Sequence, residues 1–334
     1  MQQTQDPAGR QPPLIEAVGL SKRFDDVAAV REISFTIARG EIFGFLGPNG
    51  AGKTTTINML TGLSRPDAGT IRVAGLDCTR RPKAAQHLIG IVPDDSNLYP
   101  ELTGFDNLCF CASLYGMAGA ERRERAAQLL DSFGLKEAAG RKFAGYSKGM
   151  KRKLTIAAGI IHRPQILFLD EPTTGIDVAS ARQIRQLIAE LNRSGTTIFL
   201  TTHYIEEAER LCQRIAFIVE GQIVRTDRVD DLLQPYTGRQ LLLVSVGIDP
   251  ASFSGEFAGR FPELTCERVS PQQFRVESAG PIRLNGIVGF LEERGIEVLE
   301  ARRVVPTLED VFVRETGIEG NILRREAEKR RRAA

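Results

Sequence analysis

Residues 47–55 form a glycine-rich stretch whose spacing matches G-x-x-x-x-G-K-[ST]. Loops of this kind turn their backbone N–H groups inward around phosphate oxygens, and a helix that starts at the loop adds positive partial charge. We expect Lys53 to reach the β- and γ-phosphates, Thr54 to offer its hydroxyl to Mg²⁺, and Thr55 to lie near the α-phosphate. The predicted phosphate-binding residues are Gly47, Pro48, Asn49, Gly50, Ala51, Gly52, Lys53, Thr54 and Thr55.

Two adjacent acids, Asp170 and Glu171, end an apolar run at residues 165–172. A phosphate-binding loop needs an acid on a neighbouring strand to hold metal-bound water, and we assign this role to Asp170. Glu171 lies one residue further out, where it would face the γ-phosphate and polarise the attacking water as a general base. The alternative is that both carboxylates only keep the end of the strand solvated.

The elements that position these residues have the pattern of an α/β fold. Residues 14–46 read as short strands, and 165–172 and 196–203 read as buried parallel strands with a helical segment between them. This β-α-β order predicts an α/β core with a mainly parallel sheet. A helical subdomain is expected at about 95–155.

The pattern of polar and apolar residues changes after Pro235. Three runs alternate between polar and apolar residues, and helical segments and one more strand-like run follow them. We therefore predict an ATP-binding domain at 14–234 and a small C-terminal α+β domain at 238–317. Residues 1–13 are expected to be a disordered leader, and 318–334 a basic tail.

The motifs together resemble one family, the ATP-binding subunits of ABC transporters, over residues 14–234. Where that family has a Leu-Ser-Gly-Gly-Gln signature loop, this chain has Y-S-K-G-M at 146–150, a form similar to the drug-resistance and sodium-export branch. The resemblance implies a P-loop ATPase fold, ATP and Mg²⁺, and γ-phosphate contacts from Ser147 and Gly149. Without the family context, the S-K-G sequence would be no more than a helix start.

Four further positions correspond to the family's motifs. Phe24 falls where an aromatic ring stacks on adenine, although a core phenylalanine beside a strand is the alternative. Asp177 matches a loop that couples two sites across a dimer, and His203 matches a histidine that contacts the γ-phosphate. Asp94 stands where the family usually has a metal-sensing Gln, and its neighbour Asp95 is an alternative occupant.

The resemblance also implies partners and a mechanism. Two copies would enclose ATP head to tail, between Lys53 of one and Ser147 of the other, with Thr54, Asp94 and Asp170 near the metal. A separate membrane permease would form the pathway, its contact lying in the helical section. The motif at 306–312 looks like the closing motif of the export branch, with a regulatory, dimer-supporting or purely stabilising role. The alternative function is a soluble ABC-type ATPase that acts on ribosomes or nucleic acid.

Composition sets the remaining limits. The 334 residues include 44 basic and 42 acidic side chains, so no overall positive excess favours nucleic acid. No apolar run approaches the ~18 residues of a membrane span, and the odd set of five cysteines lacks a C-x-x-C pair, which indicates a reducing cytosol. We therefore expect a cytoplasmic protein, peripheral on the inner face of the membrane. The substrate cannot be derived from these residues.

The small net charge of +2 hides an asymmetry. Six basic and two acidic residues lie from residue 321 onward, so the tail carries +4 and the rest of the chain carries −2. Such a tail could rest on anionic lipid, and a merely solvated tail is the alternative.

Overall fold

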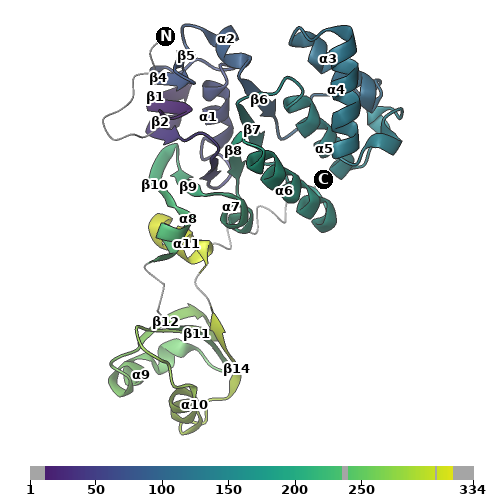
Figure 1. The fold of residues 1–334 in the computed structure, drawn as a ribbon. Coiled ribbons are helices and arrows are strands. Elements are labelled where there is room, and N and C mark those ends of the chain that lie inside the picture. The colour runs from purple at the N-terminus through teal and green to yellow at the C-terminus, as the bar shows by residue number, and fades with distance from the viewer. Residues whose placement is uncertain (1–11, 235–239, 305–306, 319–334) are drawn as a thin grey trace. The chain divides into compact units, whose positions relative to one another are not determined.

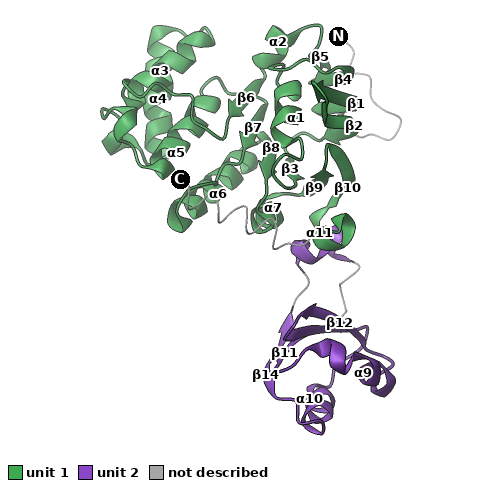
Figure 2. Cartoon of the chain, turned by 180° about the vertical axis from the view of Figure 1, so that it is seen from behind, with its two compact units in different colours: residues 1–229, 312–334 green, residues 230–311 purple. Residues whose placement is uncertain are grey.

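The computed structural model describes residues 12–234, 240–304 and 307–318. The predicted leader at 1–13 and basic tail at 318–334 therefore fall almost entirely outside the described residues. Contacts group the chain into two units, the first running to Val229 and resuming at Phe312, and the second spanning Asp230–Val311 (Figure 2).

Two sheets form the first unit (Figure 1). The first is four-stranded and antiparallel, in the order β2-β1-β4-β5, with strands β1 (Ile15–Phe24), β2 (Val27–Ile37), β4 (Ala68–Val73) and β5 (Leu76–Asp77). The second has six strands in the order β10-β9-β3-β8-β7-β6: β3 (Ile42–Leu46), β6 (Ile89–Val92), β7 (Ile166–Asp170), β8 (Thr197–Thr202), β9 (Arg214–Val219) and β10 (Gln222–Arg228). All its neighbouring pairs except β9–β10 are parallel, which confirms the predicted α/β fold.

Seven described helices connect these strands. They are α1 (Lys53–Leu60), α2 (Pro82–Gln86), α3 (Gly104–Leu114), α4 (Gly119–Ser132), α5 (Lys148–Gly159), α6 (Val178–Arg193) and α7 (Ile205–Leu211). Helix α8 (Val229–Leu233) follows β10 at the start of the second unit. Short 3₁₀ helices lie at Lys136–Ala138 and Phe143–Gly145. Helices α3 and α4 lie side by side and, with α5, form a helical region between β6 and β7 (Figure 1).

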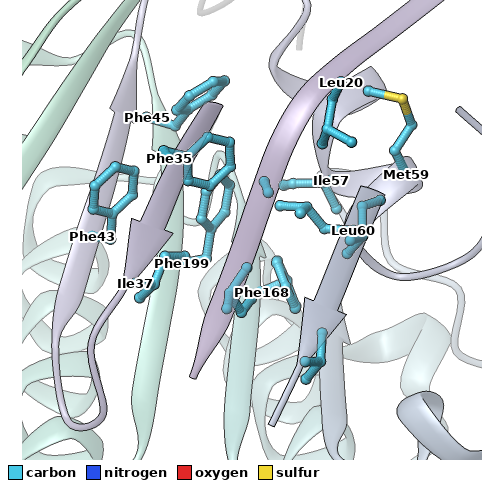
Figure 3. Close-up of a cluster of buried hydrophobic side chains, with 14 of the residues drawn as sticks. Leu20, Phe35, Ile37, Phe43, Phe45, Ile57, Met59, Leu60, Phe168 and Phe199 are labelled. Carbon is cyan, nitrogen blue, oxygen red and sulfur yellow. The ribbon is translucent and has the colours of Figure 1, made fainter. Parts of the chain in front are cut away.

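A buried hydrophobic cluster joins the two sheets and helix α1 (Figure 3). Phe35 of β2 stacks on Phe43 of β3, with ring centroids 5.6 Å apart, and both pack against Phe199 of β8. β-branched and aromatic residues favour such pleated, half-buried surfaces, and the buried rings contribute strongly to the core. This cluster fixes β3, β7 and β8, the strands whose carboxyl ends carry the candidate site.

The second unit has its own core. Its four-stranded antiparallel sheet, β12-β13-β11-β14, is formed by β11 (Gln240–Val246), β12 (Thr265–Ser270), β13 (Gln273–Ser278) and β14 (Val298–Val304). Helices α9 (Ser254–Arg260) and α10 (Leu284–Glu292) contribute Phe257 and Phe290 to a buried cluster with one face of this sheet. A 3₁₀ turn lies at Pro250–Ser252, and α11 (Leu308–Thr316) spans the boundary between the two units in the sequence.

Candidate active site

The glycine-rich loop lies between β3 and α1, as the phosphate-binding interpretation requires. Its conformation depends on glycine at two positions. A Cβ at Gly47 would lie 2.1 Å from the carbonyl oxygen of Ile218. Gly52, the N-cap of α1, has φ of 99°, a left-handed conformation that glycine adopts without strain. The loop is therefore a tightly packed turn that leads into α1. The backbone N–H groups at the N-terminus of α1 can then bind an anion held by the loop.

Lys53 is buried at the mouth of this loop, with only 7% of its surface exposed. Its ammonium donates hydrogen bonds to the carbonyl oxygens of Gly47, at 2.8 Å, and Pro48, at 3.1 Å. It also lies 3.2 Å from Oε1 of Glu171. Because burying an unpaired ammonium is costly, these three oxygens hold the charge in place.

Glu171 follows β7 directly and is held by β8 on its other side. Its backbone N–H donates to the carbonyl oxygen and the hydroxyl of Thr201, and its φ of 49° lies in the left-handed region. The carboxylate accepts hydrogen bonds from Nδ1 of His203, at 2.7 Å, and from the hydroxyl of Thr174, at 3.1 Å. A non-glycine residue in this conformation is strained, and such strain is typical of functional positions.

The surroundings keep Glu171 ionised. Burial alone raises the pKa of Glu171, but the hydrogen bond from His203 and the charge of Lys53 outweigh burial and lower it below its usual value. Nε2 of His203 is buried and has no hydrogen-bond partner among the described residues. The cluster thus presents an ionised carboxylate and an unsatisfied ring nitrogen beside the phosphate-binding loop.

Of the three residues predicted to lie near a metal ion, Thr54 and Asp170 contact each other, whereas Asp94 pairs with Arg152. The hydroxyl of Thr54 donates to Oδ2 of Asp170 at 2.9 Å, and Oδ1 of Asp170 accepts from Thr201. A hydroxyl and a carboxylate are the oxygen donors that Mg²⁺ prefers, and this ion is commonly held by one or two protein groups together with phosphate and water. The described residues contain no group of three or more His, Cys, Asp or Glu side chains suited to a metal. The pair therefore fits an ion that bound phosphate completes.

Asp94 lies after β6 and its carboxylate is 3.6 Å from Nη2 of Arg152 on α5. The same guanidinium donates to the carbonyl oxygens of Pro93 and Asp94. Burial lowers the pKa of Arg152, whereas the charges of Asp94, Asp170, Asp95 and Glu207 act in the opposite direction. Arg152 thus ties the loop at Asp94 to the helix that begins at the signature sequence.

Arg152 is not among the residues that the sequence singled out. It belongs to a basic run at 151–153, and such runs usually form a solvated helix face. In the structure only 7% of its surface is exposed.

Three predicted residues, Ser147, Asp177 and Phe24, make contacts of their own outside this cluster. Ser147 is exposed and caps α5, accepting from the backbone N–H of Met150. Asp177 caps α6 in the same way, and the N–H of Ser180 that it accepts lowers the pKa of Asp177. Phe24 is 51% exposed, with the ammonium of Lys22 5.5 Å from its ring centroid, so the core alternative for Phe24 is wrong.

Gly149 is buried on the first turn of α5. A Cβ there would lie 2.5 Å from the hydroxyl oxygen of Ser180 on α6. The glycine therefore lets the signature helix approach the helix that begins at Asp177.

Glu207 is a second buried acid that the sequence did not single out. Oε1 accepts from the hydroxyl of Thr173 at 2.8 Å, whereas Oε2 is buried without a partner among the described residues. Burial raises the pKa of Glu207, the hydrogen bonds from Thr202 and Thr173 oppose this rise, and the like charge of Glu171 adds to it. The sequence gives no signal for Glu207, because it is one of several acids on α7 and packing decides which of them is buried.

Comparison with known proteins agrees with this geometry. Residues 30–174 match the ABC transporter family. The linearmycin resistance ATP-binding protein LnrL of Bacillus subtilis (strain 168) is 41% identical over 71% of this chain and 77% of that protein. The chain belongs to the ABC transporter ATP-binding subunits. The resemblance recognised in the sequence is thus confirmed, and the protein is an ATPase of the exporter type.

Two further relatives extend the comparison. The Nod factor export ATP-binding protein I of Rhizobium sp. (strain N33) is 37% identical over 91% of this ABC subunit and 97% of its own length, so the similarity includes the second unit. A solved dimeric ATP-binding cassette in a post-hydrolysis state, bound to ADP and Pi, is 27% identical, with a TM-score of 0.59, and covers 64% of this chain and 98% of its own. The names of these relatives refer to export and resistance, and they do not favour the ribosomal or nucleic-acid alternative.

None of the helices within residues 12–234, 240–304 and 307–318 combines the length and the apolar character that crossing a bilayer would require.

Proposed function

We propose that this ABC subunit hydrolyses ATP with Glu171 as the general base, at the site formed by the glycine-rich loop. The observation that carries the proposal is the buried cluster in which Glu171 contacts both Lys53 and His203. A general base must be deprotonated, and the lowered pKa of Glu171 meets that requirement. His203 orients the carboxylate through Nδ1, and its unpartnered Nε2 is the group left to contact the γ-phosphate.

Binding of ATP would rearrange the contacts of Lys53. In the structure its ammonium donates hydrogen bonds to the carbonyl oxygens of Gly47 and Pro48 and forms an ion pair with Glu171. Phosphate oxygens are stronger acceptors for this cation than neutral carbonyl groups. Exchange of these partners for the β- and γ-phosphates frees Glu171 to face the attacking water. The adenine ring would stack on the exposed Phe24.

Mg²⁺ is the proposed cofactor, and when bound it neutralises charge on the phosphates. Thr54 would supply a hydroxyl to the ion and Asp170 would hold metal-bound water, and both side chains are already oriented by their mutual hydrogen bond. Asp94, in the loop after β6, would lie near the metal ion, and its carboxylate would be positioned by the guanidinium of Arg152. The added negative charge of Asp94, where the family usually has Gln, is offset in part by that guanidinium.

A second copy would complete the site. Ser147, Gly149 and Asp177 are the residues assigned to the γ-phosphate and to coupling across the dimer. The exposure of Ser147 at the N-terminus of α5 supports this assignment, because that end of a helix favours anions. The similar cassette solved as a dimer supports it as well.

The transport partner is proposed from the names of the relatives, which refer to export and drug resistance. A separate integral-membrane permease would contact the helical section between β6 and β7, and the ATPase would lie at the inner face of the membrane. The basic residues from 321 onward, which lie outside the described structure, are proposed to contact anionic lipid. Deletion of 321–334 should then lower binding to anionic vesicles, and unchanged binding would refute the lipid contact.

The decisive experiment is Glu171→Gln. We expect turnover to fall by about 10²- to 10⁴-fold, the usual contribution of a general base, while ATP still binds and the dimer accumulates. ATP hydrolysis, nucleotide binding and sedimentation should be measured on the same preparation. Glu190→Gln, a change of an exposed carboxylate on α6, is the matched control and should hydrolyse ATP normally. Normal turnover in Glu171→Gln would exclude the proposed role.

A further inference from the structure

Strand β14 is an edge of the sheet in the second unit. The strand order β12-β13-β11-β14 leaves one side of β14 without a neighbouring strand among the residues that the structure describes (Figure 1). None of the residues of β14 is fully buried. An open strand edge offers a row of backbone N–H and C=O groups that can pair with another chain.

Two opposite charges lie on this edge strand, two residues apart. Glu300 is opposite Ser245 of β11 and Arg302 is opposite Leu243, so both side chains project from the same face of the sheet. They are 57% and 60% exposed, and Nε of Arg302 lies 3.5 Å from Oε1 of Glu300 along the strand. Alternation of opposite charges around a central residue makes the strand complementary to a reversed copy of itself.

We infer that β14 pairs with β14 of a second copy of this chain, antiparallel, with Ala301 at the two-fold axis. In this register Glu300 of each copy lies opposite Arg302 of the other, which forms two cross-strand ion pairs. Shifting the centre to residue 300 places Glu300 opposite Glu300, and shifting it to 302 places Arg302 opposite Arg302. Opposite charges across strands stabilise pairing and like charges destabilise it, so charge selects the register centred on Ala301.

The other edge of the sheet lacks this property. On β12, Glu267 already pairs with Arg275, at 2.5 Å, and Arg268 pairs with Asp249, at 2.6 Å. Glu267 and Arg268 are also adjacent, so they point to opposite faces and cannot lie opposite each other in a symmetric antiparallel pair. The self-complementary edge is therefore β14.

The pairing is short. The register between β11 and β14 shifts between Glu300 and Val298, which leaves Leu299 as one extra residue on β14. In the register centred on Ala301, residues 303 and 304 lie opposite 299 and 298, where the bulge interrupts the strand. Regular pairing is thus confined to 300–302, and we expect weak association unless another contact holds the copies together. The inference goes beyond the proposed function and does not require ATP.

A charge exchange tests the register. Glu300→Arg and Arg302→Glu should each weaken nucleotide-free self-association by about tenfold or more, because each places like charges opposite one another. The double variant restores two opposite-charge pairs and should associate like the unchanged protein. Sedimentation of the full chain at high concentration measures this. Single variants that associate normally, or a double variant that stays monomeric, would overturn the proposal.

Cross-linking tests the position of the axis. Ala301→Cys, treated with a short thiol-to-thiol cross-linker, should give a covalent dimer that the Glu300→Arg change abolishes. Val269→Cys is the control, because it is an exposed position on the opposite edge strand, and the unchanged protein accounts for the native cysteines. Ala301 packs half-buried against the apolar cluster of the second unit, so labelling with a single-thiol reagent first establishes that the new cysteine is accessible. Failure of an accessible Ala301→Cys to cross-link would overturn the proposal. Because both measurements are made without nucleotide, they are independent of the ATP-dependent dimer.

Discussion

The two units of the chain differ in what they bury. Lys53, Arg152, Glu171, His203 and Glu207 are all buried in the first unit, whereas Ser278 is the one buried polar residue in the described part of the second. Buried charges are costly even when they are paired, and a hydrophobic replacement is often as stable. The first unit therefore carries buried groups that its stability does not require, and Lys53, Glu171 and His203 among them form the cluster at the phosphate-binding loop. The second unit has an apolar core, and its ion pairs lie at or near the surface.

This comparison predicts the largest stability effect in the second unit, at Phe257. Its ring is fully buried against Phe274 and Phe290, so Phe257→Ala should destabilise that unit by about 3 to 5 kcal/mol. Hydrogen exchange of peptides from 240–304 should rise, while ATP affinity stays unchanged. The half-buried Phe261 on the same side is the matched position, and Phe261→Ala should cost less. Loss of ATP binding in Phe257→Ala would show that the two units are not separate.

The next effect is expected in the first unit, at Lys53. Lys53→Ala removes the cation that reaches the phosphates and should weaken ATP binding by about 1.5 to 3 kcal/mol, the usual value of a charge-assisted hydrogen bond. It also leaves Glu171 without its buried cation. Titration of ATP by calorimetry measures the loss. Lys136→Ala, which removes an exposed lysine, is the control, and equal ATP affinity in both variants would argue against the phosphate role.

A smaller, pH-dependent effect is expected at Glu207. Because its pKa is raised in the folded protein, its contribution to stability is fully present below its usual pKa of 4.5 and is lost as pH rises through the folded value. Glu207→Gln should abolish this loss, so the stability of the variant relative to the unchanged protein should increase as pH rises above 4.5. Chemical unfolding at several pH values tests the slope.

Glu206→Gln supplies the control for this measurement, because Glu206 is the neighbouring, 77% exposed carboxylate on the same helix. It shows what the loss of an exposed carboxylate from this helix does to stability. A difference between Glu207→Gln and the unchanged protein that does not vary with pH would contradict the burial argument.

The smallest effect is expected for a surface ion pair of the second unit. Arg268 bonds both carboxylate oxygens of Asp249, but both residues are open to solvent, and such pairs contribute little. Arg268→Ala should leave the unfolding temperature almost unchanged. Arg275→Ala should lower it more, because the partly buried Arg275 bridges Glu267 and Asp310. The reverse order would mean that the exposed pair matters more than burial predicts.

Sequence alone was sufficient where a short motif dictates its own geometry. The loop from Gly47 to Thr55 needs a preceding strand and a following helix, and the adjacent acids need a parallel strand end, so both could be placed without the structure. Arg152 and Glu207 could not, because each belongs to a charged helical segment whose buried side is decided by packing against distant elements. The pairing order of the second sheet was also beyond prediction, since no residue pattern states which strands meet.

The left-handed backbone at Glu171 has a consequence for how this protein can change over evolutionary time. Glycine or asparagine would relieve the strain at this position, so selection for stability alone would favour their appearance there. At residue 171 the glutamate should persist where loss of hydrolysis is penalised. Glu171 is thus a point of trade-off between stability and activity. A copy of the chain released from the need to hydrolyse ATP should lose this residue early, and should become more stable as it does.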